Sequence, residues 1–190
     1  MTIQKENILP FTDRHQFRQW LSENHDTAKE CWLILKRGRP ADNEHFWYID
    51  AVEEALCFGW IDSTVTYLDG TALQRFSRRR KGSGWTELNK ERVRRLERLG
   101  MMTDAGRAVL PPMDGYIMDP DIWKALNDAG AWDGFAGLPP LYQRIRVSNL
   151  VSRLGRGDTE GYRKGLEHLI ETAREGKTFG EWDDYGRLSE

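Results

Sequence analysis

The sequence is poor in cysteine and has no long hydrophobic run. Two cysteines in 190 residues cannot form the disulfide framework of a small secreted domain. Cys31 and Cys57 both lie among apolar residues, so we interpret them as buried, reduced thiols. No apolar segment approaches the ~18 residues of a membrane span, and the N-terminal segment lacks the apolar run of a signal peptide. We therefore expect a cytoplasmic protein with no membrane association.

Known metal, cofactor and hydrolase motifs are also missing. The four histidines, at positions 15, 25, 45 and 168, show no metal-ligand spacing among themselves or with the cysteines. We therefore expect no metal site. The chain contains no G-x-x-x-x-G-K-[ST] phosphate loop, no G-x-G-x-x-G fingerprint and no G-x-S-x-G nucleophile elbow. The sequence indicates no cofactor and leaves catalytic residues unassigned.

The composition is that of a globular protein, with 39% hydrophobic and 31% charged residues and a net charge of −2. Eight tryptophans are unusual for this length, and most should be core anchors. Two adjacent prolines, Pro111 and Pro112, mark the one plausible boundary. We expect an α+β core domain over residues 1–112 and a helical subdomain over residues 113–190 that packs on it.

Helical and strand patterns alternate in the core domain. A helix capped by Thr12 or Asp13 is followed by a buried strand over residues 30–36. A second helix over residues 48–58 places Val52, Ala55 and Leu56 inward and Asp50, Glu53 and Glu54 outward. The dipeptide Asp69-Gly70 predicts an antiparallel hairpin between strands at residues 60–68 and 71–77. These elements predict a small, mainly antiparallel sheet with flanking helices.

Amphipathic helices make up the rest of the predicted structure. The best-defined one covers residues 86–99, where Leu88, Val93, Leu96 and Leu99 trace a stripe with a period of about 3.6 residues. Gly100 ends it. Further helices are predicted over residues 120–129, after Pro139-Pro140, and over residues 159–175.

Positive charge is concentrated between Arg75 and Arg98. This segment holds ten basic and three acidic residues, although the whole chain is slightly acidic. Gly82, Ser83 and Gly84 precede the helix at residues 86–99, and a helix N-terminus offers unpaired N–H groups and a partial positive charge. A phosphate, sulfate or carboxylate fits such a site. The alternative is that Ser83 or Thr86 caps the helix and that the arginines are solvated or salt-bridged.

Two further charged residues have unusual positions. Arg92 lies on the apolar stripe of its helix, so its charge must be paired, solvated at the rim or bound to a ligand. We favour Asp62 as its partner. Asp62 follows Trp60 and Ile61 at a strand start, where a desolvated carboxylate could act as a general base or form a structural salt bridge.

The order of these residues resembles the YdeI/OmpD-associated family, whose members are often called bacteriocin-protection proteins. The resemblance lies in the run Ala55-Leu-Cys-Phe-Gly-Trp-Ile-Asp62, in the spacing of Arg79, Ser83, Trp85, Asn89 and Arg92, and in the closing Trp182-Asp-Asp-Tyr-Gly-Arg-Leu188. It implies a role in stress or toxin protection but no catalytic residues. Arg78 stands where that family usually has proline.

Our leading hypothesis is therefore a cytoplasmic protein that binds an anionic small molecule at the basic helix start. The expected ligand-binding residues are Trp60, Asp62, Arg79, Arg80, Ser83, Trp85, Asn89 and Arg92. One alternative is an enzyme on a phosphorylated or carboxylated metabolite with Asp62 as general base. Others are a nucleic-acid binder, which the pI near 6.1 disfavours, and a protein-interaction module.

Overall fold

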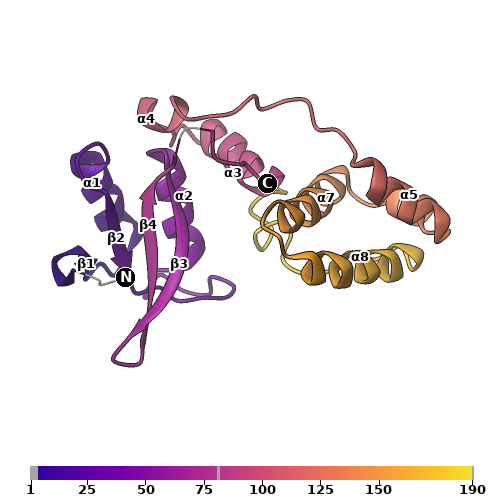
Figure 1. Ribbon diagram of the computed structural model, residues 1–190. Coiled ribbons are helices and arrows are strands. Elements are labelled where there is room, and N and C mark those ends of the chain that lie inside the picture. The colour runs from indigo at the N-terminus through magenta and orange to yellow at the C-terminus, as the bar shows by residue number, and fades with distance from the viewer. Residues whose placement is uncertain (1–3, 81, 190) are drawn as a thin grey trace. The chain divides into compact units, whose positions relative to one another are not determined.

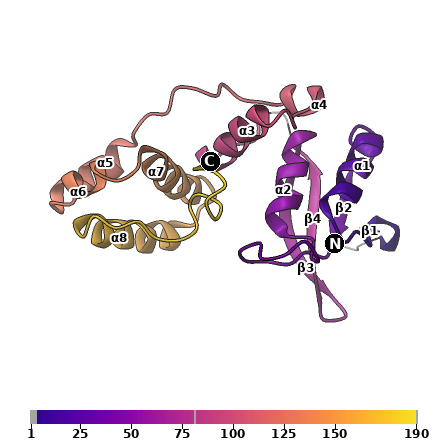
Figure 2. The same ribbon diagram turned by 180° about the vertical axis from the view of Figure 1, so that it is seen from behind.

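The computed structural model describes residues 4–80 and 82–189, which form an α+β fold with a helical C-terminal region (Figure 1 and Figure 2). The predicted fold class is confirmed. The chain divides into two compact units, of which the first comprises Met1–Ser83 with Arg92–Pro111 and the second Gly84–Glu91 with Pro112–Glu190. Helix α3 (Glu87–Arg98) contributes residues to both units.

The first unit contains a four-stranded sheet in the order β1-β2-β4-β3. The β1–β2 pair is parallel and the other two pairs are antiparallel. The strands are β1 (Ile8–Leu9), β2 (Glu30–Leu33), β3 (Trp60–Leu68) and β4 (Thr71–Arg78). The predicted hairpin is confirmed, and Asp69 and Gly70 have φ values of 49° and 80°, as a type I′ turn requires. Both views show this hairpin extending past helix α2 (Tyr48–Cys57).

A bulge in β3 explains a buried polar residue in β4. The register shifts between Asp62 and Val65, and Gln74 pairs with Val65 just after the shift. The Gln74 side-chain amide donates to the carbonyl oxygens of Ser63 at 3.3 Å and Thr64 at 3.5 Å. Gln74 is only 4% exposed, so these contacts satisfy its donors and the carbonyl groups that the bulge frees from the ladder.

Strand β2 is shorter than the sequence pattern predicts. The predicted strand over residues 30–36 ends at Leu33, and Ile34 is 53% exposed. Beyond Leu33, the backbone at Lys36 is hydrogen-bonded to the segment that leads into α2. The Lys36 N–H donates to the Phe46 carbonyl, and the Tyr48 N–H donates to the Lys36 carbonyl. An apolar run is compatible with a longer strand, but it does not show where the neighbouring strand ends.

Helices α1 (Arg14–Asn24) and α2 enclose the main core with the sheet. Asp13 caps α1 by accepting from the His15 and Gln16 N–H groups. The aromatic ring of Phe17 on α1 meets Phe76 of β4 at 5.4 Å in an edge-to-face contact. These contacts hold α1 against the sheet.

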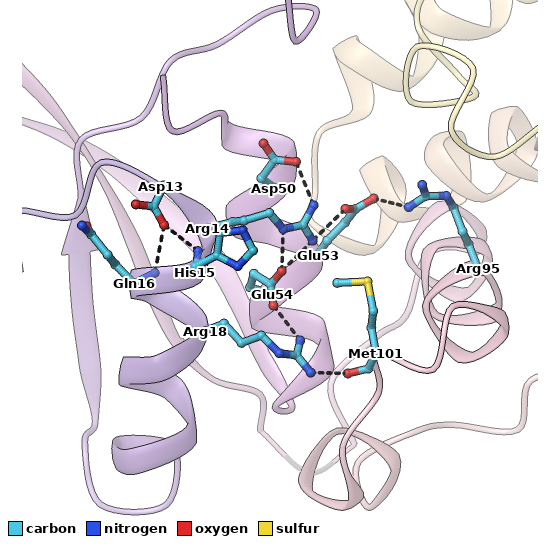
Figure 3. Close-up of polar contacts among 10 residues, drawn as sticks. All are labelled: Asp13, Arg14, His15, Gln16, Arg18, Asp50, Glu53, Glu54, Arg95 and Met101. Carbon is cyan, nitrogen blue, oxygen red and sulfur yellow. Dashed lines mark hydrogen bonds and ion pairs between the residues drawn. The ribbon is translucent and has the colours of Figure 1, made fainter. Parts of the chain in front are cut away.

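The orientation predicted for Glu53 and Glu54 is wrong, because both are buried, at 2% and 1% exposed. Figure 3 shows why the interior accepts them. Glu54 accepts from Arg14 Nε and from Arg18 Nη1, each at 2.7 Å, and Glu53 accepts from Arg95 Nη1 at 2.9 Å. A buried carboxylate is stable only when its charge is paired and its oxygens are hydrogen-bonded. The three arginines come from α1 and α3, so tertiary structure decides this orientation.

Helix α4 (Asp104–Arg107) packs against the C-terminal end of α2. The Thr103 hydroxyl donates to the Cys57 carbonyl at 2.6 Å and accepts from the Gly106 N–H at 3.3 Å. A side chain at position 106 would overlap the Cys57 carbonyl. Glycine is therefore required for the backbones of α2 and α4 to approach this closely.

The second unit is helical. Its helices are α5 (Pro120–Asp128), α6 (Trp132–Ala136), α7 (Pro140–Gly155) and α8 (Thr159–Arg174). The sequence predicted all of them except α6. The Arg146 guanidinium of α7 lies over the rings of Tyr142 and Phe179, and it donates to the Phe179 carbonyl, which ties the C-terminal segment to α7. None of the helices in the described part of the chain has the length and apolar character needed to cross a bilayer.

The buried carboxylates give a stability prediction. We expect Glu54→Gln to lower the free energy of unfolding by about 3 kcal/mol, because two guanidinium groups lose a buried ionic partner. Urea denaturation of both proteins measures the difference. Glu160→Gln is the matched control, since Glu160 pairs with Arg163 and Lys164 at an exposed position on α8. Its midpoint should stay close to that of the wild type, and an equally unaffected Glu54→Gln protein would contradict the prediction.

Candidate functional site

The centre of the predicted site is a hydrogen bond between α2 and the sheet. The Tyr48 hydroxyl, on the first residue of α2, donates to Asp62 Oδ2 on β3 at 2.6 Å. Burial raises the pKa of Tyr48, and the nearby Asp62 carboxylate raises it further. Tyr48 is therefore a neutral donor at physiological pH. Its hydrogen bond fixes the orientation of the carboxylate.

Two arginines surround this pair. Arg37 lies over the Tyr48 ring at 4.4 Å, and its Nη2 donates to Gln74 Oε1 at 2.6 Å. The positive charges of Arg92 and Arg37 oppose the rise in the pKa of Tyr48, which places both within electrostatic range of its hydroxyl. Arg92 is thus close to the Tyr48–Asp62 pair, and a direct ion pair between Arg92 and Asp62 stays a prediction.

Arg79 is a second charged group near Asp62. It is only 6% exposed, its N–H donates to the Gly59 carbonyl at 2.9 Å, and its Nη1 approaches the Ser83 hydroxyl at 3.4 Å. Burial lowers the pKa of the Arg79 guanidinium to about 10, although the Asp62 carboxylate acts in the opposite direction. Arg79 stays protonated at neutral pH, and Asp62 only partly offsets the cost of burying its charge.

The neighbours of Arg79 face solvent. Arg78 and Arg80 are both exposed, and Arg78 Nη1 donates to the Asp26 carbonyl at 2.9 Å. Within residues 4–80 and 82–189, neither arginine forms an ion pair with a carboxylate. We call Arg78, Arg79, Arg80 and Ser83 the basic loop. The sequence left two alternatives to anion binding for these arginines, a solvated surface and a salt-bridged surface. In the described ranges the salt-bridged alternative does not apply to Arg78 and Arg80.

The start of helix α3 is largely occupied by the protein's own groups. Thr86 caps it, because its hydroxyl accepts from the Asn89 N–H at 3.2 Å and its carbonyl accepts from the Lys90 N–H at 3.0 Å. The Glu87 N–H donates to the Ser148 hydroxyl at 3.0 Å. The Glu87 carboxylate, 6% exposed, pairs with Lys90 in the first turn. These contacts favour the capping interpretation over an external anion at this helix end.

The remaining predicted residues have different positions. Trp60 is fully buried, packs edge-to-face on Trp20 at 5.5 Å and donates from Nε1 to the His25 carbonyl at 3.0 Å. It is a core anchor. Trp85 and Asn89 are half-buried and belong to the second unit. In the first unit the structure brings together Asp62, Arg79 and Ser83, with Arg92 near Tyr48.

Sequence analysis missed three members of this cluster, Tyr48, Arg37 and Gln74. Only Gln74 could have been found from the sequence. Strand residues two apart share a face, so Gln74 lies on the same face as the core residue Phe76 and is expected to be buried. Arg37 follows a strand and Tyr48 begins a helix. Their meeting depends on how the connecting loop folds, which no local pattern encodes.

Thiol and metal chemistry find no support in the described residues. Burial raises the pKa of the Cys57 thiol to about 11, and Cys31 is equally buried. Both are free cysteines. No group of three or more potential metal ligands occurs in the described ranges. The polar groups that the cluster offers are guanidinium and hydroxyl groups, which are the donors that anions accept from.

A comparison with protein-family models identifies the region that carries these features. The model described as Domain of unknown function (DUF8412) matches residues 9–109, which is just over half of the chain. The chain belongs to the DUF8412 family. The match extends from β1 past α4, so it contains the ion pairs of Glu53 and Glu54, the Tyr48–Asp62 pair and the basic loop. Searches of curated proteins and of solved structures found no match.

The Tyr48–Asp62 bond can be tested by removing one hydroxyl group. We expect Tyr48→Phe to lower the free energy of unfolding by about 1–2 kcal/mol, because a partly buried carboxylate loses its donor. Tyr67→Phe is the control, since Tyr67 is on the same strand as Asp62 and is 73% exposed. Chemical denaturation should separate the two variants. Equal midpoints for both would show that the bond contributes nothing.

The cysteines give a prediction for reactivity and pH dependence. A rise in the pKa of Cys57 from 9.0 to about 11 lowers its thiolate fraction at pH 8 roughly a hundredfold. We expect both thiols of the native protein to react slowly with a disulfide reagent and rapidly after unfolding. The folded state holds the Cys57 proton more tightly than the unfolded chain, so stability should fall as the pH rises from about 9 towards 11. Fast labelling of the native protein would contradict this prediction.

Proposed function

We propose that this protein binds a small anionic ligand through the basic loop. The observation that supports it is the exposure of Arg78 and Arg80 without an acidic partner in the described ranges. Exposed arginines with no ion pair in the described ranges keep guanidinium donors available, although Arg78 Nη1 already donates to the Asp26 carbonyl. Guanidinium groups match the geometry of carboxylate and phosphate oxygens and bind them through paired hydrogen bonds.

Arg79 and Ser83 position the loop in this proposal. The Arg79 main chain is bonded to Gly59, and its side chain joins the Ser83 hydroxyl. Because burial destabilises the charge of the Arg79 guanidinium, negative charges near it are favourable. Asp62 supplies one such charge, and its bond to Tyr48 keeps it in place. An anion on the outer side of the loop would add another.

The physiological role within this proposal comes from the resemblance to the YdeI/OmpD-associated, bacteriocin-protection family. It suggests that anion binding serves protection against a stress or a toxin. Cells that express the wild type or an Arg78→Ala, Arg80→Ala variant can be compared for survival under bacteriocin challenge. Equal survival of cells with wild type, variant or empty vector would remove the protective role and leave the binding proposal standing.

Ligand titration tests the binding itself. Calorimetry at low and moderate salt would compare inorganic phosphate, a nucleoside triphosphate, a tricarboxylate and a short oligonucleotide. We expect the wild type to bind one of the small anions, more weakly at higher salt because exposed charges are screened. The Arg78→Ala, Arg80→Ala variant should bind it about tenfold more weakly or worse, because charge-assisted hydrogen bonds are lost.

The control variant is Arg163→Ala, Lys164→Ala, which removes the same charge from exposed, ion-paired positions on α8. It should retain wild-type affinity. An equal loss in both variants would mean that net charge governs binding. Affinity that grows with oligonucleotide length would favour a nucleic-acid binder, and turnover of a bound metabolite that stops in Asp62→Asn would favour an enzyme. If no anion binds at low salt, the proposal is wrong.

A further inference from the structure

Strand β3 is an edge strand of the sheet. The strand order is β1-β2-β4-β3, so β3 pairs only with β4. The part of this hairpin beyond the β3 bulge extends past helix α2 (Figure 1 and Figure 2). We call residues 65–68 of β3 the open edge. Val65 and Tyr67 in this segment are 40% and 73% exposed, so two of its apolar side chains face solvent.

The hairpin turn determines which backbone groups point outward from the open edge. A two-residue turn makes Leu68 and Thr71 a hydrogen-bonded pair. Hydrogen-bonded and non-hydrogen-bonded pairs alternate along an antiparallel ladder. Thr66 therefore also bonds to β4, whereas Val65 and Tyr67 direct their N–H and C=O groups away from it. Among the described residues, no backbone bond outside the ladder reaches these outward groups.

The two edges of the sheet differ in how they are protected against pairing. Natural edge strands are usually short, or they carry prolines, lysines or inward-pointing charges. Strand β1, at the other edge, has only two residues and is followed by Pro10. The segment at residues 63–68 reads Ser-Thr-Val-Thr-Tyr-Leu, which contains no charge and no proline and favours strand structure. One edge is thus protected, and the open edge is free to pair.

We propose that the open edge pairs with the open edge of a second copy of this chain. In an antiparallel pair with a two-fold axis at Thr66, Val65 of each copy lies opposite Tyr67 of the other. Both residues direct their backbone groups outward, so these pairs exchange N–H···O bonds in both directions. A β-branched residue opposite an aromatic one is a favourable cross-strand pair, and no like charges face each other across this uncharged segment.

The register is fixed by which outward groups are free. An axis at Val65 would place Tyr67 opposite Ser63, whose carbonyl already accepts from the Gln74 side chain. An axis at Tyr67 would place Val65 opposite Asp69, which lies in the turn. Only the axis at Thr66 pairs both outward residues with each other, and it covers both exposed side chains of the open edge. The open edge is therefore complementary to itself. Because one short strand pair makes a small interface, we expect a dimer of the transient class.

Sedimentation equilibrium of the full chain over a wide range of concentrations measures the association. We expect the average mass to rise from that of the monomer towards that of a dimer as the concentration increases. Amide hydrogen exchange locates the interface in the unaltered chain. Exchange at Val65 and Tyr67 should slow over the same range of concentrations, because pairing gives their outward N–H groups acceptors.

A charge exchange tests the register. The double variant Val65→Lys, Tyr67→Lys places two lysines opposite each other in the paired copies, and Val65→Glu, Tyr67→Glu places two glutamates there. Each variant alone should stay monomeric at concentrations where the wild type associates, because like charges directly opposite each other destabilise a strand pair. An equal mixture of the two should form mixed dimers, since each lysine then lies opposite a glutamate.

The matched control is Val151→Lys, Leu154→Lys on α7. These two apolar residues are 42% and 44% exposed, much like Val65, and they lie outside the sheet. The control should associate like the wild type.

Three results would overturn the inference. The first is a wild type that stays monomeric at every concentration. The second is association without slower exchange at Val65 and Tyr67, which would place the interface elsewhere. The third is a mixture of the lysine and glutamate variants that forms no mixed dimers although the wild type dimerises. Because anion binding at the basic loop is measured separately, failure here leaves the proposed function untouched.

Discussion

The pairing of two buried carboxylates with arginines from two other helices is the constraint on which the first unit depends. Glu53 and Glu54 lie on a helix that is buried on almost every side, and Arg14, Arg18 and Arg95 supply the compensating charge. Neither carboxylate can stay in the interior unless these helices are placed so that their guanidinium groups reach it. An apolar interface tolerates small shifts, whereas this ionic one fixes the distances between α1, α2 and the second half of α3.

The candidate site follows from that placement. Helix α2 carries Tyr48 at its start, so fixing the helix also fixes the donor that holds Asp62. Arg95 is bonded to Glu53, and Arg92 precedes it by one helical turn, which brings Arg92 into electrostatic range of Tyr48. Among the cationic groups near Asp62, Arg92 thus has its position set by the ion pairs of the buried carboxylates, whereas Arg79 and Arg37 are held by contacts of their own.

Much of the local structure was predictable. Asp69-Gly70 determined the hairpin because both residues adopt positive φ, and the leucine and valine stripe determined α3. The excess of arginines identified the basic loop. The sequence could not show that Ser148 and Glu87 occupy the start of α3, because Ser148 lies on a distant helix. It also could not show that Tyr48, Arg37 and Gln74 gather around Asp62.

By itself, the sequence determined the α+β class, the hairpin, most of the helices and the concentration of positive charge, because each depends on residues close together in the chain. Tertiary structure decided which charges are paired and which are free. Glu53 and Glu54 look like solvent-facing residues of an amphipathic helix, and only arginines 36 to 42 residues away make their burial possible. Arg78 and Arg80 look like their basic neighbours, yet they differ from Arg95 because no acidic side chain in the described fold reaches them. The energy of a charge depends on its surroundings, and for these residues the surroundings come from distant parts of the chain.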